Sequence, residues 1–157
     1  MASVSGIVMK LRIFFSLLGI LVGLSVVFVF GIKFHNWNTA LWGLLSAIPA
    51  SLTFSLHICY LKGVWQTYPY RLKYMVITGC FFQLAGIIGF VTYLALGFYF
   101  QQGLQIYGNG YFLTTVWCFM TWKWGLLLLY FTRSYRQLLC DVYTILPTEA
   151  PPLNGDD

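Results

Sequence analysis

A polar stripe runs through one of the most apolar parts of the chain. Its six residues recur at helical spacing and therefore share one face of an α-helix. They are Trp42, Ser46, Pro49, Thr53, His57 and Tyr60. The imidazole of His57 can carry a proton, form a hydrogen bond or bind a metal. We expect this face to point into a helix bundle or a cavity, where His57 is either a hydrogen-bonded core histidine or a ligand-binding group.

Lys123 is the second candidate, because it stands near the middle of an apolar segment between two tryptophans. A lysine at the centre of a membrane helix costs about 2.5 to 3.5 kcal/mol on insertion scales. Every Asp and Glu lies at or beyond Asp141, so no carboxylate in the first 140 residues can offset that charge. The side chain either snorkels to the membrane surface or meets a backbone carbonyl, water or an anionic ligand. The absence of paired carboxylates also argues against an enzyme.

Two further groups of candidates lie at the ends of the apolar segments. His35 belongs to "IKFHNWN", where it is either a solvated interfacial residue or a first contact for a ligand. Aromatic residues alternate with arginines in the run 130–136, which contains Phe131, Arg133 and Tyr135. That pattern is typical of an interfacial belt. It equally suits a planar ligand that stacks on the rings while arginine binds its carboxylates.

The elements that must position these residues are membrane helices. The chain has 157 residues, of which 59% are hydrophobic and 8% charged. So few charges cannot cover the surface of a water-soluble globule. Since a helix of roughly 20 apolar residues crosses a bilayer, we predict an all-α integral membrane protein. Its predicted membrane domain covers residues 1–132, with four transmembrane helices at about 11–32, 39–61, 74–100 and 112–132.

Two features predict how these helices pack and point. Gly19 and Gly23 form a G-x-x-x-G spacing that lets another helix approach closely, within or between protomers. Basic residues gather before the first helix, between the second and third, and after the fourth, whereas Lys33 stands alone on the other side. Because short basic loops stay in the cytosol, we expect both termini to be cytosolic.

The predicted cytosolic tail, 133–157, carries two overlapping sorting patterns and ends in a Pro-rich, acidic stretch that we expect to be partly disordered. Asp141 to Leu146 fits the acidic dileucine pattern D-x-x-x-I-L, whose final pair is Ile145 and Leu146. Tyr143 to Leu146 fits Y-x-x-Φ. Sorting adaptors bind such signals. They predict an endosome or lysosome membrane, with the plasma membrane as the alternative.

Three stretches resemble the heme-responsive gene family of small haem transporters. They are "GIKFHNWNTA", "SLHICYLKGVW" and "YFLTTVWCFMTWKWGLLLLYFTRSYRQ". The resemblance covers essentially all four spans. It implies haem as the transported substrate and His57 as an axial ligand of the haem iron. The family's Phe-Ala-Arg-Lys-Tyr motif falls on Phe131, Arg133 and Tyr135, with Ser134 in place of its lysine.

One departure from the family concerns the second outer loop. Members often carry a histidine there, and the corresponding residue is Gln101. Three possibilities remain open: Tyr107 or Tyr111 takes over its role, His35 does, or the outer ligand is lost and uptake is weaker.

The leading hypothesis is a haem importer that moves haem from the extracellular or endolysosomal lumen to the cytosol. Haem would meet His35 or the loop of Tyr107 and Tyr111, pass to His57 with Lys123 near a propionate, and leave by the cluster around Arg133. Four helices make a thin wall for so large a ligand, which favours a homo-oligomer, and nothing indicates nucleic acid as a partner. The alternative is a non-transporting four-span membrane organiser or trafficking adaptor.

Overall fold

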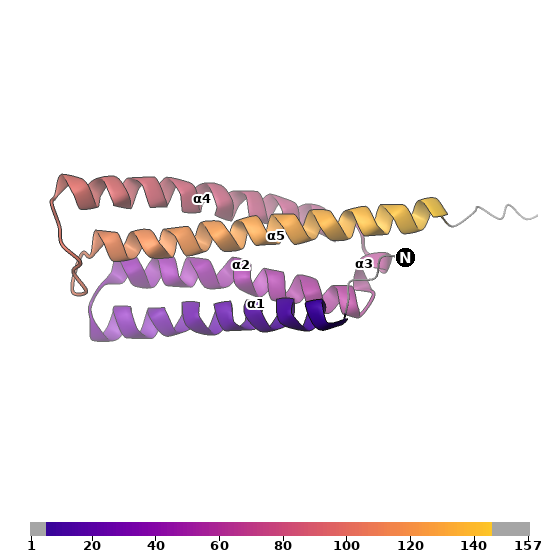
Figure 1. Cartoon of the computed structure of the whole chain (residues 1–157), viewed down its shortest axis with the longest axis horizontal. Coiled ribbons are helices and arrows are strands. Elements are labelled where there is room, and N and C mark those ends of the chain that lie inside the picture. Colours follow the sequence, from indigo (N-terminus) through magenta and orange to yellow (C-terminus); the bar gives the residue numbers. More distant parts are fainter. Residues whose placement is uncertain (1–5, 146–157) are drawn as a thin grey trace, which may run out of the picture.

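The computed structural model describes residues 6–145 and is helical almost throughout (Figure 1). Its elements are α1 (Gly6–Val26), a continuing π-helix η1 (Val27–Lys33), α2 (Trp37–Leu61), the short α3 (Val64–Thr67), α4 (Arg71–Tyr99) and α5 (Tyr111–Ile145). Four helical segments are long and apolar enough to cross a membrane: Gly6–Lys33, Trp37–Leu61, Arg71–Tyr99 and Tyr111–Cys140. The prediction of an all-α membrane protein with four transmembrane helices is therefore confirmed.

The long helices lie side by side in the order α4, α5, α2, α1 (Figure 1). Helix α5 packs along both α4 and α2, and α2 packs along α1. By contrast, the backbones of α1 and α5 do not run close together, and the two helices meet through side chains such as Arg12 and Phe131. The two helices flank α2 and leave a space between them, which is where the polar side chains described below are found.

Small residues set the distance between neighbouring helices. A Cβ atom added at Gly23 of α1 would lie 3.0 Å from the backbone oxygen of Gly43 in α2. One added at Gly19 would overlap the indole of Trp124 in α5. The G-x-x-x-G spacing of the first helix therefore lets other helices approach closely within one chain.

The two ends of the bundle differ in their connections. The start of α1, the α3 segment and the end of α5 lie at one end (Figure 1). At the opposite end the α1–α2 and α4–α5 loops touch each other, because the backbone N–H of Gly108 donates to the Phe34 oxygen over 3.3 Å. Asn36 caps α2 there by accepting from the backbone N–H of Thr39 over 3.1 Å.

Helix α5 continues well past residue 132, where the sequence places the start of the tail, to Ile145. The continuation is stabilised by packing, since Tyr135 and Leu139 join a buried cluster with Leu56 and Trp65. Of the predicted sorting signal, Asp141, Tyr143 and Ile145 lie in the last turns of α5. Leu146 lies outside the described residues, with the rest of the tail.

Candidate functional site

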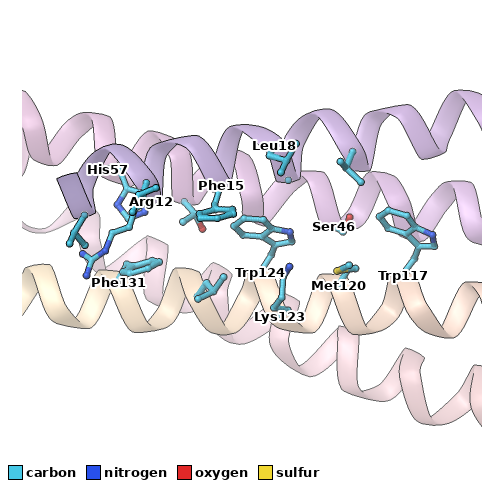
Figure 2. A pocket seen from close by; sticks show the side chains of 16 residues that line it. Arg12, Phe15, Leu18, Ser46, His57, Trp117, Met120, Lys123, Trp124 and Phe131 are labelled. Carbon is cyan, nitrogen blue, oxygen red and sulfur yellow. The ribbon is translucent and has the colours of Figure 1, made fainter. Parts of the chain in front are cut away.

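A groove of about 490 Å³ lies between α1 and α5, with α2 contributing residues between them (Figure 2). Most of its lining is apolar and aromatic, including Phe15, Trp117, Trp124 and Phe131. Its polar and charged lining residues are Arg12 from α1, Ser46, Thr53 and His57 from α2, and Lys123 from α5. We call this space the α1–α5 groove.

The polar stripe of α2 points inward, as its spacing predicts. Ser46, Pro49, Thr53 and His57 are all buried. The hydroxyl of Thr53 donates to the Pro49 carbonyl over 2.8 Å, and that of Ser46 donates to the Gly43 carbonyl over 2.9 Å. Both hydroxyls are thus held by their own helix. His57 is the member of the stripe whose ring remains available to the groove.

His57 is fully buried at the end of the groove nearest the start of α1 (Figure 2). Its Nδ1 lies 2.8 Å from the hydroxyl oxygen of Tyr135. Its Nε2 is buried and has no hydrogen-bond partner among residues 6–145. The Phe131 ring packs edge-on against the imidazole, with centroids 4.7 Å apart.

The hydroxyl of Tyr135 can decide which nitrogen of His57 carries the proton. It donates to the sulfur of Met9 over 3.7 Å, and its oxygen can then accept the Nδ1–H of His57. In that arrangement Nε2 keeps a free lone pair, which is the form of histidine that binds a metal. Tyr135 itself is fully buried, stacks on the Tyr60 ring at 4.2 Å and does not line the groove.

Arg12 is the functional candidate that the sequence analysis missed, because it served there only as a basic residue before the first helix. Its guanidinium carbon lies 4.7 Å from the centroid of the Phe131 ring, and its Nη1 is buried without a hydrogen-bond partner in the described part of the chain. A signal was present in the sequence. Arg12 lies seven residues before Gly19, two helical turns along the same face of α1.

Lys123 lines the middle of the groove, between the positions of Phe131 and Trp117 (Figure 2). Its Nζ lies 4.9 Å from the ring of Trp124, a cation–π contact. Lys123 precedes Phe131 by eight residues, which is about 12 Å along a helix that rises 1.5 Å per residue. The groove therefore carries two cationic groups, one beside His57 and one nearer mid-membrane.

The predicted outer residues lie at the opposite end of the bundle and do not line the groove. His35 is exposed and has a φ of 52°, in the left-handed region. Tyr107 is exposed too, and its ring packs edge-on against Phe34 at 5.1 Å. Tyr111 is half-buried against Phe100.

Arg133 points away from the other two residues of the C-terminal motif, since residues two apart on a helix lie about 200° apart, whereas Phe131 and Tyr135 are four apart and both contact His57. Phe131 lines the α1–α5 groove, and Tyr135 is buried behind His57. Arg133 is exposed and lines a separate cavity of about 610 Å³ on the α4–α5 side, together with Gln83 and Tyr130. The structure therefore brings His57, Lys123 and Phe131 to one groove and leaves Arg133 outside it.

Comparison with known proteins identifies the family. The family model described as "Haem-transporter, endosomal/lysosomal, haem-responsive gene" matches residues 72–124. The heme transporter hrg-1 of Caenorhabditis elegans is 30% identical over 151 residues, which cover 92% of this chain and 76% of hrg-1. The chain belongs to this haem-transporter family. The heme transporter hrg-4 of the same organism is 25% identical over 148 residues, covering 80% of this chain and 79% of hrg-4.

No solved structure matches the chain. Membership confirms the family resemblance noted from the sequence, and it places the protein among haem transporters and not among enzymes. The residues matched by the family model include Lys123 and most of α4 but not α2. The family match therefore does not include His57, and the support for a role of this residue comes from the geometry of the groove.

Proposed function

We propose that this protein imports haem from the extracellular or endolysosomal lumen into the cytosol, and that the α1–α5 groove holds haem on the way. One observation carries the proposal within a haem-transporter family. The Nε2 of His57 is buried on the wall of the groove without a protein partner among the described residues. Burying a polar nitrogen without a hydrogen bond costs free energy, and a ligand that coordinates it removes that cost.

The chemistry of haem suits the lining of this groove. Haem is a flat, largely apolar macrocycle whose iron accepts an axial histidine. Aromatic side chains at Phe15, Trp117 and Trp124 offer ring surfaces to a planar ligand. In this proposal His57 binds the iron, Tyr135 orients the imidazole from behind, and Lys123 meets a propionate nearer mid-membrane.

The distribution of basic residues supports the orientation of the bundle in this proposal. We place the end of the bundle that holds the start of α1 and the end of α5 in the cytosol, because short basic loops resist translocation. Haem then arrives at the end that carries His35, Tyr107 and Tyr111, and it reaches His57 near the cytosolic side. Arg133, which is exposed near the same side, would act after haem has left the groove.

Two further proposals concern assembly and location. Leu11, Phe15 and Leu18 line the groove from α1 and are also exposed. A second copy of the chain on this side would therefore shield haem from lipid. Native mass spectrometry in detergent would detect the homo-oligomer.

For location we propose the endosome or lysosome membrane, reached through adaptors that bind the signal beginning at Asp141. Imaging of the tagged protein with and without Asp141→Ala and Ile145→Ala tests this, and an unchanged distribution would remove the signal from the account.

The transport proposal is tested by uptake of a fluorescent haem analogue and by the Soret band of the purified protein. His57→Ala should abolish most of the uptake and shift the Soret maximum. Ser55→Ala is a matched control, because Ser55 is exposed two residues away on the same helix. If the wild-type protein takes up no analogue above background, the chain is better described as a membrane organiser or trafficking adaptor. Unchanged uptake by His57→Ala would remove His57 from the mechanism.

A further inference from the structure

The guanidinium of Arg12 has an unusual environment for a cation in a membrane helix. It lies over the Phe131 ring, 4.7 Å from its centroid, and its Nη1 is buried without a hydrogen-bond partner among residues 6–145. Arginine carries five N–H donors and no acceptor, and a buried donor of a charged group is costly to leave unpaired. A bound anion would satisfy it.

Residues 6–140 supply no carboxylate for this position, because they contain neither Asp nor Glu. The first acidic residue of the chain, Asp141, comes ten residues after Phe131, or about 15 Å further along α5. Met9, Tyr135 and His57, the neighbours of Arg12 at this end of the groove, hydrogen-bond to one another, and Tyr135 also interacts with Arg12. None of the three is an acidic residue, so residues 6–140 offer Arg12 no counter-charge.

Arg12 and His57 lie next to each other at the same end of the groove, and both approach Phe131 (Figure 2). We propose that Arg12 is a carboxylate-binding position for the propionate of the porphyrin whose iron His57 binds. Its planar fork pairs with a carboxylate in bidentate fashion, and Phe131 holds that fork by stacking. Arg12 thereby selects porphyrins with free propionates over esterified or neutral ones. This inference rests on the proposed haem-transport function and names one more contact in the same groove.

The test compares haemin with haemin dimethyl ester, whose propionates are capped. Each is titrated into purified full-length protein in lipid nanodiscs, and the Soret band gives the Kd. The variants are Arg12→Gln, which removes the charge, and Arg12→Lys, which keeps it without the planar fork. Lys10→Gln is the matched control, since Lys10 is exposed two residues earlier on α1. Circular dichroism and gel filtration report whether each variant is folded.

We expect Arg12→Gln to raise the Kd for haemin about tenfold to a hundredfold, the range for a hydrogen bond to a charged group. The Kd for the dimethyl ester should change less than about twofold, and Arg12→Lys should fall between wild type and Arg12→Gln. Lys10→Gln should match wild type with both ligands.

Three outcomes would overturn the inference. Equal weakening of haemin and its ester by Arg12→Gln would show that the residue acts on the fold of the groove. Equal affinity of the wild-type protein for the two ligands would show that no carboxylate is recognised. Absence of any Soret band with the wild-type protein would refute the haem-binding proposal itself and this inference with it. In the first two cases a His57-dependent Soret band would leave the proposed function standing.

Discussion

The substitution Tyr135→Phe removes one oxygen atom from the support of His57. The Tyr135 hydroxyl lies 2.8 Å from His57 Nδ1, while the ring stacks on Tyr60 at 4.2 Å with an interplanar angle of 14°. Phenylalanine keeps that stack and the volume of the side chain. The variant therefore changes the orientation and tautomer of the imidazole with little change in packing.

Two mechanisms predict different magnitudes for this variant. Losing a hydrogen-bond partner that orients a metal-binding histidine typically costs about tenfold to a hundredfold in affinity, roughly 1.4 to 2.7 kcal/mol. A hydrogen bond that only joins two membrane helices contributes about 0.6 kcal/mol on average, and its loss would change haem affinity by less than about threefold. We expect the larger effect, because Nδ1 has the Tyr135 oxygen as its hydrogen-bond partner, Nε2 has no partner among residues 6–145, and His57 lines the groove.

The assay is a double-mutant cycle on the Soret titration, with His57→Ala, Tyr135→Phe and the double variant. If Tyr135 acts through His57, the double variant should bind haem no more weakly than His57→Ala alone. Tyr60→Phe is the control, since it keeps the same stack and no hydrogen bond of the Tyr60 hydroxyl is seen in residues 6–145. Additive losses in the double variant would refute the argument and assign Tyr135 a direct contact with haem.

Three other variants test the remaining parts of the account. Arg133→Gln should leave the haem Kd of the purified protein within about twofold, because Arg133 lies outside the groove, and a tenfold loss in the Soret titration would contradict its placement. Lys123→Met should raise thermal stability by up to about 2.5 kcal/mol, since a central lysine is costly in a membrane. The same variant should lower haem uptake. A variant less stable than wild type would show that the charge of Lys123 is paired within the fold. Gly86→Leu should destabilise the α4–α5 pair by about 1 to 3 kcal/mol, because a Cβ at Gly86 would lie 2.5 Å from the backbone nitrogen of Trp122. Gly103→Ala, which meets nothing within 4 Å, is its control in the same thermal melts.

The sequence predicts those features that depend on one helix at a time. Four apolar segments of sufficient length predict the four spans, and helical spacing predicts that Ser46, Thr53 and His57 face inward. Both predictions are confirmed. The residue type alone also predicts that the imidazole of His57 can form a hydrogen bond, carry a proton or bind a metal. In each case the information lies within about 25 neighbouring residues.

Features that depend on how helices meet could not be predicted in this way. The partner of His57 Nδ1 is Tyr135, 78 residues further along the chain, and no local pattern specifies that pairing. Arg12 meets Phe131 because α1 and α5 both pack on α2 and their side chains meet in the groove between them. Phe131, Arg133 and Tyr135 form one cluster in the sequence, but the helix turns Arg133 to the face opposite Phe131 and Tyr135.

Two half-buried cations, Arg12 and Lys123, line the groove. A central lysine and an arginine on a membrane helix each oppose insertion, and the chain contains no carboxylate before Asp141 to offset them. A sequence selected for stability alone would place apolar side chains at Lys123 and Arg12. Residues that lower the stability of a fold are expected mainly at functional sites. Both side chains line the groove together with His57, whose Nε2 has no partner among residues 6–145. In the function that we propose, haem, an apolar ring system with an iron centre and two carboxylates, is the partner of all three.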